Sequence, residues 1–194
     1  MGYTILETMI AVSLFLVVVM AGMGALLNAN LLHQKSQNMR SVMDNLSFIM
    51  EDMGRNLRTG YKYQCFNSSQ SLTPSTVGNP RSCADGWALV FESAYGSSST
   101  FTDQWAYYLS NDDANGIGMI YKSTDGAASW IQLTPNEVDI DQASSFSVLG
   151  AEPRTTGDRQ QPFVVIKLVG KIKLRNIETP FSLQTSVSQR LIDI

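Results

Sequence analysis

Few residues in this chain have the types and spacing that catalysis or metal binding requires. The single histidine, His33, ends an apolar stretch, and a catalytic triad or a metal site would need partners that its neighbours do not supply. The acidic turn with Asp112, Asp113 and Asn115 offers oxygen ligands that suit Ca²⁺, although a solvated polar turn explains it more simply. We therefore expect a protein that is not an enzyme and that carries no cofactor.

The two cysteines, Cys65 and Cys83, enclose a loop rich in serine, threonine, proline and asparagine. In an oxidising compartment this arrangement favours a disulfide, and in a reducing one it leaves two free thiols. Closing a loop of this size stabilises a fold by about 3 kcal/mol through the entropy of the unfolded chain.

The stretch STDGAASW, residues 123–130, is close to the Asp-box hairpin of sialidase-like propellers. Ala127 stands where that motif has glycine, and the stretch occurs once, whereas a propeller needs repeated blades. We therefore expect an ordinary hairpin turn here.

Residues 3–23 are almost wholly apolar and carry one charge, Glu7, and the next charged residue is Lys35. About 20 apolar residues cross the hydrocarbon core of a bilayer, whereas a cleavable signal has an apolar core of roughly 7–15 residues. We predict a membrane-spanning helix within residues 3–33. A carboxylate inside hydrocarbon costs a few kcal/mol, so Glu7 either needs a cationic partner or lies among lipid headgroups at the helix N-terminus, where an acid is favourable.

The helical pattern continues beyond the apolar segment, over residues 34–60. Apolar residues recur there at steps of three and four, which predicts an amphipathic helix whose methionines pack in a core and do not form a metal or cofactor site. No proline occurs before Pro74, and Thr59-Gly60 offers a stop. The pattern therefore predicts one helix over residues 4–59, roughly 80 Å long.

The remainder of the chain, residues 61–194, has the composition of a β-rich head. The whole chain has 194 residues, a net charge of −3 and a pI near 5.1, which argues against non-specific nucleic-acid binding. Short apolar runs bounded by turn residues predict strands at 87–91, 105–109, 117–121, 130–133 and 146–149.

Alternation is clearest near the end of the chain, where residues 164–174 and 181–190 predict an antiparallel hairpin with one buried face. The apolar stripe of residues 39–57 is the expected cover for that face. A long helix packed on an antiparallel sheet makes the predicted fold class α+β.

The N-terminal run Gly2-Tyr3-Thr4-Ile5-Leu6-Glu7, followed by the long apolar helix, resembles the processing site of type IV pilins and type II secretion pseudopilins. The resemblance is strong over residues 2–60 and looser beyond, where the closing FSLQTSVSQR is similar to the end of larger minor pilins and J-type pseudopilins. It implies that a prepilin peptidase cleaves after Gly2 and that Tyr3 becomes the methylated N-terminus. It also implies that Glu7 of one subunit faces the cationic N-terminus of another inside a filament.

The resemblance further implies partners and a location. The partners are other pilin or pseudopilin subunits, the prepilin peptidase and an inner-membrane assembly platform. The head is expected outside the cytoplasmic membrane, which the helix spans once before the subunit joins an extracellular or periplasm-spanning filament. Pilus and secretion filament, major and minor subunit, and a role in adhesion, motility, DNA uptake or secretion all remain open. The alternative is an extracytoplasmic binding or enzymatic domain on a permanent single-span anchor.

One departure concerns the leader, because family members carry lysine or arginine before the glycine and only Met1 precedes Gly2 here. Residues 1–2 are therefore interpreted as the remnant of a longer leader. By the positive-inside rule alone, Lys35 and Arg40 would place the C-terminal side in the cytoplasm, whereas the resemblance implies the reverse orientation.

Overall fold

The computed structural model describes residues 4–67, 70–72, 79–97, 99–110, 116–153, 160–174 and 177–190. The chain divides into two compact units, Met1–Ser41 and Val42–Ile194. The division follows residue contacts and falls inside the helix, whereas the sequence-based boundary between residues 33 and 34 follows polarity. The C-terminal turns of the helix thus belong to the second unit, which we call the head.

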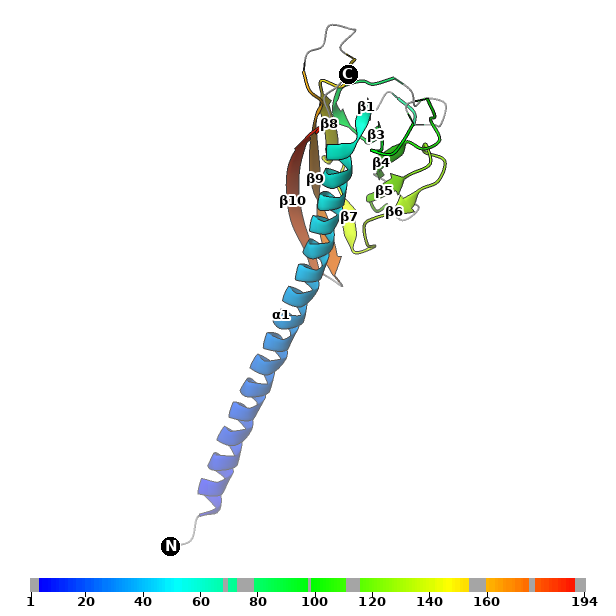
Figure 1. Ribbon diagram of the computed structural model, residues 1–194. Coiled ribbons are helices and arrows are strands. Elements are labelled where there is room, and N and C mark those ends of the chain that lie inside the picture. The colour runs from blue at the N-terminus through cyan, green and yellow to red at the C-terminus, as the bar shows by residue number, and fades with distance from the viewer. Residues whose placement is uncertain are drawn as a thin grey trace. The chain divides into compact units, whose positions relative to one another are not determined.

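The predicted helix is present as α1, Ile5–Thr59 (Figure 1). It ends where the sequence predicted, since Gly60 follows directly. A Cβ atom at residue 60 would overlap the ring of Phe91 and lie 3.0 Å from the backbone oxygen of Glu92. Glycine, which has no Cβ, is therefore the residue that fits at this position. The end of the helix is therefore set by a close approach to the head as well as by local propensity.

The described part of the head forms two antiparallel sheets, which together with α1 confirm the α+β class. The first sheet has the order β1-β3-β4-β5-β6 and consists of Tyr61–Phe66, Ala88–Glu92, Trp105–Ser110, Met119–Ser123 and Ile131–Gln132. The second has the order β10-β9-β8-β2, with β7 also paired to β9. Its strands are β2 Cys83–Gly86, β7 Val138–Ile140, β8 Ser145–Leu149, β9 Phe163–Leu174 and β10 Ile177–Ser188.

The predicted hairpin is the longest pairing in the head. β9 and β10 are antiparallel from Phe163↔Ser188 to Leu174↔Ile177, and the other edge of β9 pairs with β8 and then β7. One face is buried as predicted; its members include Val164, Ile166, Leu168, Ile172, Phe181 and Val187. β10 pairs only with β9 among the described strands, and an edge strand of this kind tolerates Pro180, which has no N–H to donate.

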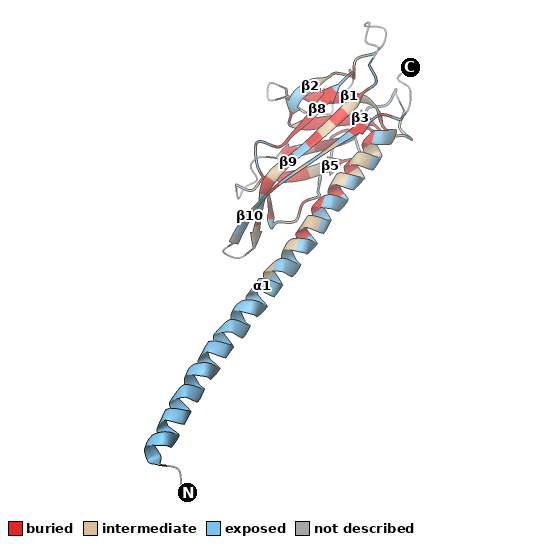
Figure 2. Cartoon of the chain, turned by 90° about the vertical axis from the view of Figure 1, so that its left-hand side faces the viewer, coloured by how far each residue is buried: buried red, intermediate tan, exposed pale blue. Residues whose placement is uncertain are grey.

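The predicted amphipathic stripe is part of the head: Figure 2 shows buried positions on α1 only in its C-terminal turns, along the side next to the strands. Its buried members are Val42, Leu46, Ile49, Met53 and Leu57. The stripe contacts more than the hairpin that the sequence suggested as its cover. Gly54 lies against Val187 of β10, whereas Asp52 and Asn56 on the same stretch of the helix both hydrogen-bond the hydroxyl of Tyr107, in β4 of the first sheet. The helix therefore packs on both sheets.

Candidate functional site

The apolar segment at the start of α1 is the first candidate functional surface. Its large side chains are exposed on every side of the helix, from Ile5, 82% exposed, to Leu32, 67% exposed. By length and composition α1 is able to cross a membrane. Side chains of this kind need an apolar environment that the single chain does not supply.

Glu7 lies in the first turn of α1, with an exposed side chain. Thr4 precedes the helix, and its hydroxyl oxygen accepts a hydrogen bond of 3.3 Å from the backbone N–H of Glu7. Threonine at the N-cap with glutamate three positions later is the pattern of a capping box, and an acid in the first turn interacts favourably with the helix dipole. Glu7 therefore has a local role in starting the helix. An experiment on filament assembly must distinguish this local role from a contact with another subunit.

Several predicted site residues lie outside the described part of the chain. These are Gly2 and Tyr3, the predicted cleavage and methylation positions, and Asp112, Asp113 and Asn115, the predicted Ca²⁺ candidates. His33 is described and exposed, and its Nε2 lies 3.0 Å from the side-chain nitrogen of Gln37. In the ranges that the structure describes, no group of three or more His, Cys, Asp or Glu side chains is placed to hold a metal ion.

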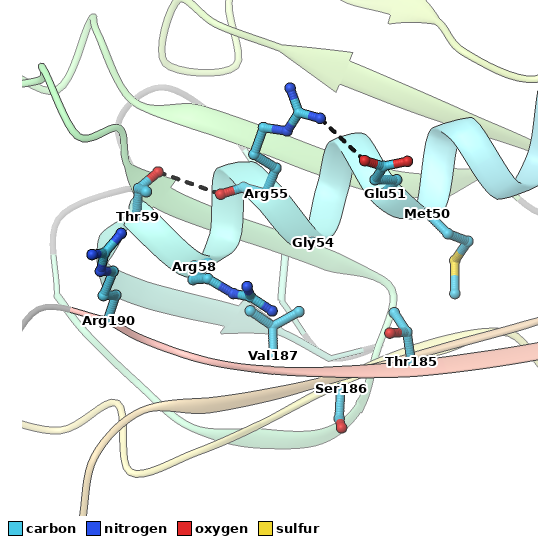
Figure 3. A pocket seen from close by; sticks show the side chains of 10 residues that line it. All are labelled: Met50, Glu51, Gly54, Arg55, Arg58, Thr59, Thr185, Ser186, Val187 and Arg190. Carbon is cyan, nitrogen blue, oxygen red and sulfur yellow. Dashed lines mark hydrogen bonds and ion pairs between the residues drawn. The ribbon is translucent and has the colours of Figure 1, made fainter.

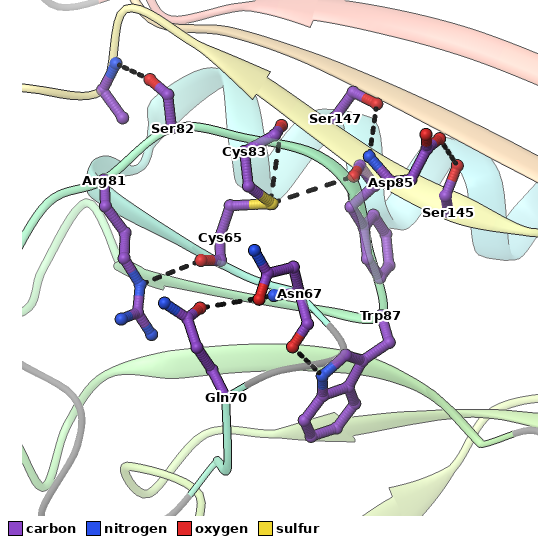
Figure 4. Close-up of a disulfide and its surroundings, with 12 residues drawn as sticks. Cys65, Asn67, Gln70, Arg81, Ser82, Cys83, Asp85, Trp87, Ser145 and Ser147 are labelled. Carbon is purple, nitrogen blue, oxygen red and sulfur yellow. Dashed lines mark hydrogen bonds between the residues drawn. A yellow bond between two sulfur atoms is a disulfide. The ribbon is translucent and has the colours of Figure 1, made fainter.

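The predicted disulfide between Cys65 and Cys83 is present, with Cα atoms 5.5 Å apart (Figure 4). Cys65 lies in β1 of the first sheet, paired with Leu89, and Cys83 lies in β2 of the second, paired with Val148. The bond therefore joins the two sheets, which the sequence did not reveal. Gly86 packs directly on it, because a Cβ there would lie 2.5 Å from one sulfur and 2.7 Å from the other.

Polar side chains fasten the end of α1 to the first sheet. Asp52 accepts a 3.0 Å ion-pair hydrogen bond from Lys122 of β5 and a 3.3 Å hydrogen bond from the hydroxyl of Tyr107. The same hydroxyl accepts a 2.9 Å hydrogen bond from Asn56. Burial, more than any neighbouring charge, raises the pKa of Tyr107, so this phenol stays protonated and available as a donor. The sequence shows each charge but not this pairing across 70 positions.

A hollow of about 470 Å³ lies on the other side of the helix end, between α1 and β10 (Figure 3). Its lining includes Arg55, Arg58 and Arg190, and the backbone N–H of Arg190 donates a 2.8 Å hydrogen bond to the backbone oxygen of Arg58. Glu51 pairs with Arg55 at 3.1 Å in an exposed ion pair. The hollow is open and carries an excess of positive charge.

The turn at residues 123–129 is the hairpin that the sequence predicted between two strands, here β5 and β6. Asp125 organises it: its carboxylate accepts hydrogen bonds from the N–H and hydroxyl of Ser129 and from the hydroxyl of Ser123, and these lower its pKa to about 2. Ala127 has φ = 67°, a left-handed conformation that favours glycine. This conformation explains why the Asp-box hairpin has glycine at the position that Ala127 occupies here.

An acidic pair that sequence reasoning missed lies where β3 leads into residues 93–103. Glu92 is fully buried, and burial together with the charge of Asp103 raises its pKa to about 7. The hydroxyl of Tyr61 donates a 2.8 Å hydrogen bond to the backbone oxygen of Gly96 in the same segment. A glutamate at the end of an apolar strand carries no signal of burial in the sequence, because strand ends are commonly exposed.

No protein family, no curated protein and no solved structure matches this chain. The function must therefore be argued from the residues and their geometry.

Proposed function

We propose that this chain is a structural subunit of a type IV pilus or type II secretion-like filament and that it performs no catalysis. A prepilin peptidase would cleave the precursor after Gly2, and the subunit would reside in the cytoplasmic membrane with its head outside. An assembly platform would then transfer it into the filament, where apolar helices of neighbouring subunits replace the lipid.

The observation that carries the proposal is one uninterrupted helix with two different surfaces. Its first part exposes apolar side chains on all sides, and its last part is built into the core of a disulfide-linked α+β head. A helix of this kind suits a subunit that exchanges lipid for a bundle of like helices. It also suits a permanent anchor, so Glu7 is the residue that separates the two functions.

In the filament proposal, Glu7 pairs with the N-terminal ammonium of Tyr3 in a neighbouring subunit. Removing one partner of a buried ion pair typically costs about 3–5 kcal/mol, because the other charge remains buried without compensation. A permanent anchor would place Glu7 at the lipid headgroups instead, where loss of its charge costs much less.

The test is Glu7→Gln in cells that make the complete precursor and the assembly machinery. Glutamine keeps the capping-box pattern, so helix initiation is preserved while the charge is lost. We expect normal membrane levels and normal cleavage, but strongly reduced recovery of the variant in sheared filaments.

The matched control is Thr4→Ala, which removes the N-cap and leaves the charge of Glu7. Loss of an N-cap costs about 0.5–2 kcal/mol of helix stability. If Thr4→Ala lowers incorporation as much as Glu7→Gln does, incorporation is sensitive to the start of the helix in general, and the loss in Glu7→Gln is not evidence of an ion pair. Normal incorporation of Glu7→Gln would support the anchored-domain alternative, as would images of the purified protein that show no bundle of helices in a fibre core.

A further inference from the structure

The acidic pair of Glu92 and Asp103 lies at one end of the pairing between β3 and β4. Glu92 is the last residue of β3, and Gln104 comes directly before β4. The side-chain amide of Gln104 donates a 3.4 Å hydrogen bond to Oε1 of Glu92. Glu92 is 0% exposed and Gln104 is 1% exposed, and Asp103 is the neighbour of Gln104 in the chain. Two carboxylates and one amide thus lie near one another, with Glu92 and Gln104 buried and Asp103 half-buried.

Three oxygens of this cluster lack a hydrogen-bond donor in the part of the chain that the structure describes. They are Oε2 of Glu92, Oδ1 of Asp103 and Oε1 of Gln104, and each is buried. Buried polar atoms in folded proteins are nearly always paired, and an unpaired buried carboxylate is among the most costly arrangements. Three such acceptors, on side chains that interact with one another, make up a set of oxygens that a cation would compensate.

The surrounding protein groups compensate only part of this charge. The second oxygen of Asp103 accepts a 2.7 Å hydrogen bond from the N–H of Ser97. The charge of Lys62 favours the ionised form of Glu92, but burial and Asp103 outweigh it. A proton on Glu92 would neutralise one carboxylate and would leave Oδ1 of Asp103 and Oε1 of Gln104 as acceptors without a donor.

We propose that Glu92, Asp103 and Gln104 bind one divalent cation and that this cation is Ca²⁺. Calcium takes six to eight oxygen ligands and accepts carboxylate, amide and backbone carbonyl oxygens in flexible geometry. A backbone oxygen also lies nearby: a Cβ atom added at Gly96 would lie 2.8 Å from Oε2 of Glu92 and 3.3 Å from the backbone oxygen of Ser93, which accepts one hydrogen bond from the N–H of Gly96 and keeps a second lone pair. The bound ion holds the segment that joins β3 to β4 against the end of the sheet.

The position of Gly96 supports this assignment. Any side chain at residue 96 would meet the Glu92 carboxylate, so glycine keeps that carboxylate accessible to the backbone of the segment. Tyr61 holds the same glycine through its hydroxyl. The proposal does not depend on filament assembly, and its test is independent of that function.

The experiment uses the full chain in detergent micelles, freed of metal with a chelator and then titrated at pH 8. The first probe is Tb³⁺, a luminescent substitute for Ca²⁺ that nearby aromatic rings sensitise; Tyr61 and Trp105 lie next to the cluster in the β3 pairings. We expect saturable emission at one equivalent of Tb³⁺, displaced by Ca²⁺ and much less by Mg²⁺. The second readout is thermal unfolding, which Ca²⁺ at a hundredfold excess over its Kd should raise by about 5–10 °C.

Two charge-removing variants, Glu92→Gln and Asp103→Asn, test the assignment of the ligands. Each should weaken Ca²⁺ binding at least tenfold and abolish the Ca²⁺-dependent rise of Tm. Without metal, neither should lower Tm at pH 8, because each removes an uncompensated buried charge, and this result also shows that the variants fold. Glu51→Gln is the matched control, since that carboxylate is exposed on α1 and should leave binding unchanged.

The acidic turn at Asp112 and Asp113 is the competing Ca²⁺ candidate, so the double variant Asp112→Asn/Asp113→Asn completes the set. Its binding should equal that of the unaltered protein. The proposal is overturned if the metal-free protein shows no Ca²⁺-dependent change in either readout. It is equally overturned if binding survives Glu92→Gln and Asp103→Asn but is lost in the double variant.

Discussion

Gly86 packs so closely on the disulfide that the cost in free energy of unfolding of a side chain at residue 86 should depend on whether the sulfurs are present. A Cβ atom at residue 86 would lie 2.5 Å and 2.7 Å from the sulfurs of Cys65 and Cys83, and 2.9 Å from the backbone oxygen of Phe66. Ordinary contacts between nonbonded heavy atoms begin near 3.5 Å. The perturbation is therefore Gly86→Ala, made once with the disulfide intact and once in the Cys65→Ala/Cys83→Ala background.

The expected magnitudes can be worked out separately for the two backgrounds. Overpacking against a fixed group costs about 1–3 kcal/mol, so Gly86→Ala should lower the free energy of unfolding by at least that amount when both sulfurs are present. Removing the disulfide alone should cost about 3 kcal/mol, from the entropy of a loop that spans 18 positions. With the sulfurs gone, the contact with Phe66 remains, and Gly86→Ala should cost at least ~1 kcal/mol less than before.

The assay is denaturant unfolding of the four proteins of this cycle under non-reducing conditions, followed by circular dichroism and by tryptophan fluorescence. Gly24→Ala is the control, because nothing lies within 4 Å of the position that its Cβ would occupy. It should leave unfolding of the head unchanged. Equal costs of Gly86→Ala in the two backgrounds would refute the reasoning, since the sulfur atoms would then not be what excludes a side chain at residue 86.

Three further predictions concern the head. Asp52→Asn removes the ion pair that fastens α1 to the first sheet and should lower the free energy of unfolding by about 1–3 kcal/mol, whereas Glu51→Gln, in an exposed pair, should change it by less than about 0.5 kcal/mol in the same denaturant titration. A protein that begins at Gln34 should be folded and monomeric in size-exclusion chromatography. One that begins at Tyr61 should aggregate, because the sheet faces that α1 covers become exposed. If the shorter protein is equally stable and monomeric, α1 does not cover the sheets as described. Burial raises the pKa of Asp139, but its hydrogen bonds and the neighbouring lysines outweigh burial, so the pKa lies below its ordinary value of 3.8. The ionised carboxylate therefore stabilises the fold above pH 3.8, and this stabilisation is lost as the pH falls through the lowered pKa. Asp139→Asn should accordingly make the free energy of unfolding less dependent on pH on the acid side of a stability–pH profile.

Local pattern was sufficient for the elements that repeat a simple period. The helix was predicted over 4–59 and is Ile5–Thr59, because its apolar positions keep a helical step and no proline interrupts them. The closing hairpin was predicted because β9 alternates over 12 residues, long enough for a period of two to be unmistakable. The candidate strands at 87–91, 105–109, 117–121, 130–133 and 146–149 overlap β3, β4, β5, β6 and β8, with bounds that differ by up to two residues at either end.

Shorter and less regular strands were missed. In β1, Lys62 has φ = 53° and the pairing register shifts between Tyr61 and Gln64, so a bulge disrupts the alternation that a pattern needs. β2 ends in Gly86 and β7 has three residues, too few for any period to emerge. These strands exist because neighbouring strands supply their hydrogen bonds, and the neighbours are distant in sequence.

The amino-acid sequence by itself determined the apolar segment, the amphipathic continuation of the helix, the alternating hairpin and the presence of two cysteines that can pair. Each of these depends on residues close together in the chain, whose polarity and spacing act locally. Only the tertiary structure decided that the disulfide joins two sheets, that Asp52 meets Lys122, and that Glu92 is buried beside Asp103. The physical reason is that burial and pairing depend on which distant segments pack together, and a charged or small residue carries no local mark of the partner that it will meet.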